Sequence, residues 1–198
     1  YTIVSVLAAL SVGTVATVSR AWGEGNRARA EGEAAAASVV AVLAGVPLTA
    51  LGLWALPAMA ALFPMGGAPG ATAAAQGFLR WEAGALLFLC LDLAATGVFR
   101  GAGRTAVPMA ASIAANALNV LLAWMFMFGN LGAPRLGLEG AGIATASAMA
   151  FQGLLTFGWL WTAGSPVRLR ASSFARTRAA DLARLAGVAV PAAVEPLV

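Results

Sequence analysis

Several stretches of this chain stay apolar for longer than the core of a soluble domain requires. There are six such segments, at residues 1–18, 37–63, 78–99, 107–128, 138–163 and 182–198. The longer ones exceed the roughly 18 to 20 residues that an α-helix needs to cross a bilayer. Lipid offers the backbone no hydrogen-bonding partner, so such spans must be helical. The pattern predicts an all-α fold, a polytopic bundle of transmembrane helices.

Composition excludes the other broad classes. The chain is 61% hydrophobic and 10% charged, with a mean hydropathy of +0.85. A soluble domain of this composition would have a largely apolar surface. The net charge of +4 is carried by arginines that lie mostly in loops, so no nucleic-acid partner is expected. With no His and one Cys, neither a metal site nor a cofactor is expected.

The arginines alternate with the order of the loops. Nine of them follow the first, third and fifth segments: Arg20, Arg27, Arg29, Arg100, Arg104, Arg168, Arg170, Arg176 and Arg178. The intervening loops carry only Arg80 and Arg135, and Arg184 begins the last segment. The positive-inside rule therefore predicts that the Arg-bearing loops face the cytoplasm. The expected location is the cell (inner or plasma) membrane, which the chain crosses several times.

A polar, Arg-rich segment at residues 165–181 separates the fifth apolar segment from the sixth. The favoured interpretation is a solvated inner loop that obeys the charge rule. The alternative is a helix on the membrane surface, with four side chains in contact with lipid: Leu169, Phe174, Leu182 and Leu185. Either arrangement suits a connector between two helix bundles.

Five motifs follow one another along the chain. They are Ala9 to Asn26, Gly97 to Pro108, Asn116 to Asn119, Leu136 to Ser147, and Leu185 to Glu195. In order, spacing and expected sidedness they resemble the multidrug and toxic compound extrusion (MATE) transporters. On this resemblance, the chain holds the later half of the second helix, helices three to six and the beginning of the seventh.

The resemblance implies an architecture and an activity. It implies twelve helices in two six-helix lobes, around a cavity that opens alternately to each side of the membrane. It also implies export of organic cations in exchange for protons or sodium ions. Residues 1–164 would then be a partial first lobe, 165–181 a cytoplasmic connector and 182–198 the start of the second lobe. The expected partners are small organic cations, the lipid bilayer and the missing helices of the same full-length chain.

Glu195 is the first candidate for binding a cation or substrate. It follows Asp181 by about fourteen residues, which would carry it roughly 20 Å inward along a helix. An ionisable group at that depth is costly unless it is paired, hydrated or protonated. It would bind a proton, a sodium ion or a cationic substrate; the alternative is a structural pair, or a segment that does not span. By resemblance, the seventh helix carries a functional acid in some members.

Asp92 is the second candidate, within the segment 78–99 and two helical turns from Arg100. An ion-binding role and a structural pair with Arg100 are both open. By resemblance, the family's polar position in this helix falls one residue later, on Leu93.

Asn116, Asn119 and Thr145 are the uncharged candidates, because each offers an oxygen ligand or a hydrogen bond. Asn116 and Asn119 are three residues apart and are expected on one helical face. Hydrogen bonding between helices is the alternative role. By resemblance, Asn119 and Thr145 line the cavity of the first lobe in some members. The acid often found four residues after the second asparagine is replaced by Ala123.

A stripe of small residues begins the fifth apolar segment: Gly137, Gly140, Ala144 and Ala148. Small residues let transmembrane helices approach closely. We therefore expect this segment to pack tightly against a neighbour.

The predicted function is secondary antiport that exports organic cations or drugs in exchange for protons or sodium ions. The alternative is a lipid-linked saccharide flippase of related architecture, which would need a strongly basic cavity. A membrane enzyme has little support, because no metal-ligand cluster and no nucleophile–base pair is found. A scaffold without transport activity is the remaining alternative.

Overall fold

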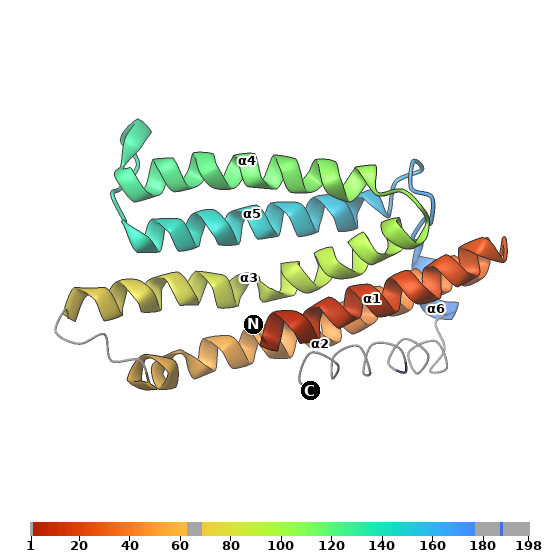
Figure 1. Cartoon of the computed structure of the whole chain (residues 1–198), viewed down its shortest axis with the longest axis horizontal. Coiled ribbons are helices and arrows are strands. Elements are labelled where there is room, and N and C mark those ends of the chain that lie inside the picture. The colour runs from red at the N-terminus through yellow and green to blue at the C-terminus, as the bar shows by residue number, and fades with distance from the viewer. Residues whose placement is uncertain (1, 63–68, 177–186, 188–198) are drawn as a thin grey trace.

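The computed structural model describes residues 2–62, 69–176 and 187. These residues form long helices that run side by side along the molecule (Figure 1). The elements are α1 (Thr2–Gly23), α2 (Arg27–Leu62), α3 (Pro69–Gly101), α4 (Ala106–Phe128), the 3-10 helix η1 (Asn130–Gly132), α5 (Leu138–Trp159) and α6 (Ala171–Arg176). The all-α prediction is confirmed.

Within the described residues, four helical segments are long and apolar enough to cross a membrane. They are Arg27–Ala58, Thr72–Gly101, Ala106–Phe128 and Leu138–Trp159. The first predicted segment corresponds to α1. The sixth segment, residues 182–198, and with it Glu195, lies outside the described residues apart from Gly187.

Two predicted segments were too short at their beginnings. Helix α2 begins at Arg27 rather than at residue 37, because residues 27–36 are rich in Ala, Glu and Arg, which favour helix. Helix α3 begins at Pro69 rather than at residue 78, with proline at its first position. Helix α3 also continues to Gly101, so the connection to α4 is confined to residues 102–105. Hydropathy marks only the apolar part of each helix.

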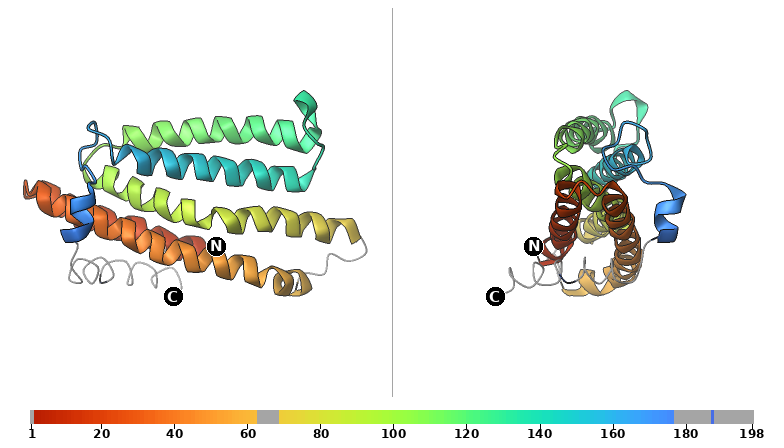
Figure 2. Two further views of the ribbon diagram at one scale, coloured as in Figure 1. Left: turned by 180° about the vertical axis from the view of Figure 1, so that it is seen from behind. Right: turned by 90° about the vertical axis from the view of Figure 1, so that its right-hand side faces the viewer.

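Helix α3 lies at the centre of the bundle. It packs against α1, α2 and α5, while α4 packs mainly on α5. Seen end-on, the α1–α2 pair and the α4–α5 pair lie on opposite sides of α3 (Figure 2).

Glycines bring α5 very close to its neighbours. A Cβ atom at Gly140 would lie 2.6 Å from the carbonyl group of Phe126 on α4, and one at Gly153 would overlap the carbonyl oxygen of Phe88 on α3. Ala144 and Ala148 are buried. The small-residue stripe is therefore confirmed from Gly140 onward. Gly137 instead precedes α5 with φ of 56°, a backbone conformation that suits glycine.

Glycines also bring α1 against α3. A Cβ atom at Gly97 would lie 2.8 Å from the Thr14 Cβ, and one at Gly101 would lie 3.0 Å from the Val18 Cβ. Because these two glycines are four residues apart, they lie on one face of α3. They allow α1 to approach α3 closely over one full turn. The Gly-rich motif is thus a helix-packing surface as well as a connection.

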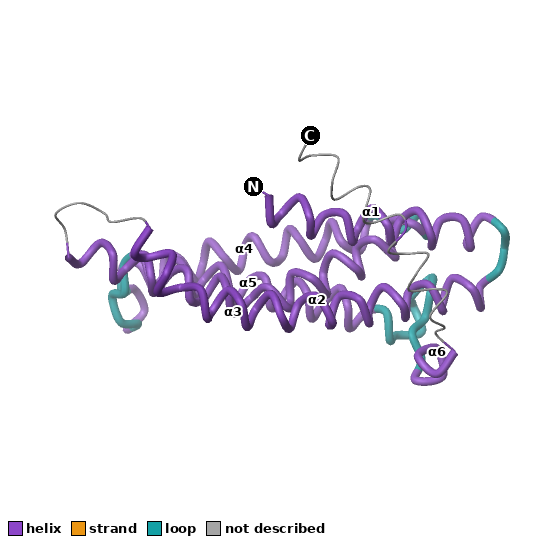
Figure 3. Tube along the Cα trace, turned by 90° about the horizontal axis from the view of Figure 1, so that it is seen from below, coloured by secondary structure: helices purple, strands orange, loops and turns teal. Residues whose placement is uncertain are grey.

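The loops that carry most arginines meet at one end of the bundle, on the right in Figure 1. We call this the Arg-bearing end; it holds the α1–α2 turn, the α3–α4 connection and the segment after α5. Viewed from below, α6 lies at the same end (Figure 3). The shared end agrees with the predicted sidedness.

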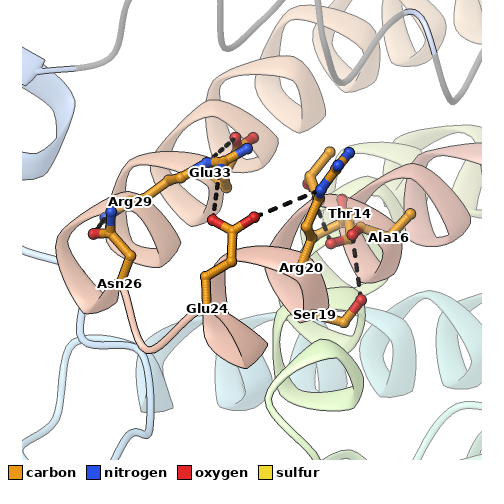
Figure 4. A network of polar contacts seen from close by, with 9 residues as sticks. Thr14, Ala16, Ser19, Arg20, Glu24, Asn26, Arg29 and Glu33 are labelled. Carbon is orange, nitrogen blue, oxygen red and sulfur yellow. Dashed lines mark hydrogen bonds and ion pairs between the residues drawn. The ribbon is translucent and has the colours of Figure 1, made fainter.

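An ion-pair network holds the α1–α2 turn (Figure 4). The carboxylate of Glu24 lies 2.6 Å from Nη1 of Arg29 and 3.6 Å from Nε of Arg20. The Asn26 side-chain oxygen accepts a hydrogen bond from the backbone N–H of Arg29 at 3.0 Å, which caps the start of α2. The polar contacts fix how α2 leaves the turn.

The segment after α5 is not a solvated loop throughout, nor does Leu169 contact lipid. Leu160, Val167 and Leu169 are buried in one cluster with Phe99, and the Leu169 N–H donates to the Leu160 carbonyl at 2.8 Å. Phe174 stacks on Trp161 with ring centroids 5.8 Å apart. The chain reverses after α5, and this reversal folds its apolar side chains onto the end of the bundle. Leu182 and Leu185 lie outside the described residues.

We expect Gly153→Ala to destabilise the complete protein, because the new methyl group overlaps the Phe88 backbone. Overpacking of this kind costs about 1–3 kcal/mol. Gly158→Ala is the control on the same helix, since nothing lies within 4 Å of a Cβ there. Thermal unfolding in detergent measures the difference. Equal stability of the two variants would contradict the proposed close contact.

Candidate functional site

A cavity of about 430 Å³ opens between α1, α3, α4 and α5. Its polar lining comes from Ser11 on α1, Asp92, Thr96 and Arg100 on α3, Ser112 on α4 and Gln152 on α5. Thr105 in the α3–α4 connection also lines it, which places the cavity toward the Arg-bearing end. Ionisable side chains inside a membrane-spanning bundle are costly, so those that line such a cavity are candidates for function.

Asp92 is the acid of this cavity, and only 8% of its surface is exposed. Its Oδ2 accepts a hydrogen bond from Nε2 of Gln152 at 2.9 Å. Its Oδ1 lies 2.9 Å from the Thr156 hydroxyl and 3.4 Å from the Thr96 hydroxyl. The carboxyl group is therefore surrounded by uncharged polar groups from two helices.

Helix geometry explains how this cluster forms. Asp92 and Thr96 are one turn apart on α3, and Gln152 and Thr156 are one turn apart on α5. Gly153 lies between the α5 pair, where a Cβ atom would overlap the Phe88 carbonyl oxygen of α3. The tight crossing that the glycine permits brings the short polar side chains within hydrogen-bonding distance.

Arg100 lines the same cavity but does not pair with Asp92. The guanidinium group belongs to an exposed residue about 12 Å further along α3. The two residues form no ion pair within 4.0 Å in the described part of the chain, and the nearest partners of Asp92 are neutral. The structural pair that the sequence left open is not made.

Asn119 and Thr145 are brought together, as the interhelical alternative predicted. The Asn119 amide on α4 donates to the Thr145 hydroxyl on α5 at 3.3 Å. The same hydroxyl donates back to the Ala141 carbonyl at 3.0 Å. Neither residue lines the cavity that contains Asp92.

Asn116 has a different environment from Asn119, although the two were expected on one face. It is exposed, and its amide donates to the Ser112 carbonyl of its own helix at 2.8 Å. Asn119 is half-buried against α5. The three-residue spacing turns the side chains far enough apart for one to face a helix and the other to lie open.

Sequence reasoning missed several polar residues of α3 and α5. They are Thr96, Gln152 and Thr156, which are of interest only because they contact Asp92. Gln152 and Thr156 are 60 and 64 residues from Asp92 in the sequence. Glu82 was missed too, although it is an acid in the membrane-spanning part of α3. The rule that flags intramembrane acids would have found it.

We expect a cysteine at position 112 to react with a charged, water-soluble methanethiosulfonate reagent in membranes, because Ser112 lines the open cavity. Ala115→Cys, one turn along α4 and buried, is the matched control and should react at least several-fold more slowly. The single native thiol, Cys90, is buried and should add little background. Reaction at position 112 as slow as at the buried control would contradict a water-filled cavity.

Comparison with known proteins places this architecture in a family. The MatE family model matches residues 1–125. A probable multidrug resistance protein NorM of Thermotoga maritima is 31% identical over 77% of this chain and 32% of its own length. A second NorM, of Mesorhizobium japonicum, is 32% identical over 58% of this chain and 24% of its own length. The chain thus spans a third or less of these relatives.

The fold agrees with a solved structure. A crystal structure of MATE in the bent conformation superposes with a TM-score of 0.85 at 24% identity, covering 99% of this chain and 42% of that one. The chain belongs to the MatE family, whose members are multi-pass membrane transporters rather than enzymes.

Proposed function

We propose that the complete protein is a secondary active antiporter. It exports organic cations or drugs in exchange for protons or sodium ions. Drugs are included because its NorM relatives are probable multidrug resistance proteins. The observation that carries this proposal is Asp92, an acid buried among neutral groups inside a membrane-spanning bundle of this family, beside an open cavity.

Charge explains why such an acid suits antiport. A buried carboxylate whose partners are neutral leaves one negative charge in a medium of low polarity, which is costly. A proton, a sodium ion or an organic cation would each neutralise it. If only one of them binds at a time, binding of the ion favours release of the drug, and the two fluxes are coupled.

The proposal extends to the organisation of the chain. Residues 1–164 are part of a first lobe, 165–181 a cytoplasmic connector and 182–198 the start of a second lobe. Asn116, Asn119 and Thr145 are further candidate ligands in the first lobe. Glu195 is the candidate coupling acid of the second lobe.

A lipid-linked saccharide flippase remains the second candidate by architecture. Such a protein needs a basic cavity to hold pyrophosphate. The cavity described above has one arginine, Arg100, and one acid, Asp92, in its lining. The acid offsets the arginine, so this lining is not the strongly basic one that a polyanionic ligand would need.

Efflux of a cationic dye from proteoliposomes that contain the complete protein tests the proposal. We expect efflux under an imposed proton or sodium gradient, and the effective gradient identifies the coupling ion. No efflux under either gradient, together with co-purified anionic saccharide lipid, would shift the function to the flippase.

We expect Glu195→Gln to reduce gradient-driven efflux to the level of empty liposomes, because the amide cannot bind and release a proton or balance a cation. Insertion and purification yield should stay unchanged. Glu31→Gln, at the Arg-bearing end of α2, is a control that should retain efflux. Unimpaired efflux by Glu195→Gln would remove this residue from the coupling site.

A further inference from the structure

The Thr156 hydroxyl has more acceptors around it than it has hydrogens. Its oxygen lies 2.9 Å from Oδ1 of Asp92, 2.9 Å from the Gln152 carbonyl oxygen and 3.3 Å from the Gly153 carbonyl oxygen. A hydroxyl group has one hydrogen to donate and two lone pairs that accept. It can donate to one of the two oxygens at 2.9 Å or share its hydrogen between them. Because a carbonyl oxygen carries no hydrogen, only the Asp92 contact can gain a second one, and it does so when the carboxyl group is protonated.

Two hydrogen-bond arrangements fit the same heavy-atom positions. When Asp92 is ionised, Thr156 donates to Oδ1. When Oδ1 carries a proton, the carboxyl group donates to the Thr156 oxygen, and the hydroxyl hydrogen turns to the Gln152 carbonyl. Threonines in helices commonly make this bond to the carbonyl four residues earlier.

Thr145 shows the second arrangement on the same helix. Its hydroxyl donates to the Ala141 carbonyl at 3.0 Å and accepts from the amide of Asn119 on the neighbouring helix at 3.3 Å. Asp92 is the interhelical partner of the Thr156 hydroxyl, as Asn119 is of the Thr145 hydroxyl. An amide always has a hydrogen to donate, whereas a carboxyl group has one only when it is protonated.

The other carboxyl oxygen does not need to change. Oδ2 accepts from Gln152 at 2.9 Å in both arrangements, so the amide holds the carboxyl group in place while Oδ1 gains or loses the hydrogen. Thr96 lies at 3.4 Å from Oδ1 and donates weakly there at most. Gln152 and Thr156 therefore hold the Asp92 carboxyl group in place both when it is ionised and when it is protonated.

The charged groups near Asp92 are few. Arg100 is the one cation in the lining of the cavity, while the neighbouring helices contribute the uncharged Ser11, Ser112 and Gln152. Glu82 lies about 15 Å away along α3. The charged residues of the other packed helices lie toward their ends: Arg20 on α1, Arg27, Arg29, Glu31 and Glu33 on α2, and Glu139 on α5. Within the described residues, no second carboxylate lines the cavity to share the proton.

We propose that Oδ1 of Asp92, held by Gln152 and Thr156, is a proton-binding site of the first lobe. It takes one proton from water in the cavity and returns it to that water. A role of this site in transport rests on the proposed antiport, with the proton as the ion that the first lobe binds. The binding itself does not require transport and is measurable without it.

Infrared difference spectra of the complete protein between acid and alkaline pH test the site. We expect a protonated-carboxyl C=O band at acid pH that Asp92→Asn removes and Glu82→Gln retains. In Thr156→Val the band should remain at a shifted frequency, because the carboxyl group has lost its hydrogen-bond acceptor. Thr145→Val, the matched change on the same helix, should leave the frequency unchanged.

The outcomes separate this site from the proposed function. Identical spectra for the wild type and Asp92→Asn would overturn the site, even if gradient-driven efflux is observed. The predicted band with no efflux would support the site and count against antiport. If Asp92→Asn does not yield folded protein, the comparison of Thr156→Val with Thr145→Val decides: a shift confined to Thr156→Val supports the site, and no shift overturns it.

Discussion

The close approach of the α3 and α5 backbones is the contact on which the described bundle depends. In lipid, apolar helices gain little from burying side chains against one another, so close packing and polar contacts must hold them together. Gly153 against Phe88 permits such packing at the centre of the bundle. Glycines also permit close packing of α1 against Gly97 and of α4 against Gly140. The other long helices therefore pack on α3 or α5.

The same crossing creates the polar cluster. Short side chains beside a glycine contact can reach across to the facing helix, and Asp92 meets Gln152 and Thr156 in this way. Packing and chemistry are therefore not separate features of α5. A change that widens the crossing would also separate the acid from the groups that hold it.

Much of the fold was predictable, because apolar length, arginine placement and small-residue spacing are local signals. They predicted helical spans and an end rich in arginine, and both agree with the structure. The partners of Asp92 were not predictable, since a contact between α3 and α5 depends on a crossing point that one sequence does not define. The burial of Leu169 was missed for a similar reason: a polar, Arg-rich segment gave no sign that it folds back onto Phe99.

The buried position of Leu169 means that the chain stays attached to the described bundle beyond the end of α5. A connector that left the bundle at Trp159 would let the following residues swing freely from the last turn of α5. The cluster with Phe99 and Leu160 instead anchors the chain about ten residues further on, at Leu169. A force applied to the chain after Leu169 would therefore act on the buried cluster, which includes side chains of α1 and α3, and not on the last turn of α5. The length of chain that can move freely after α5 is correspondingly shorter.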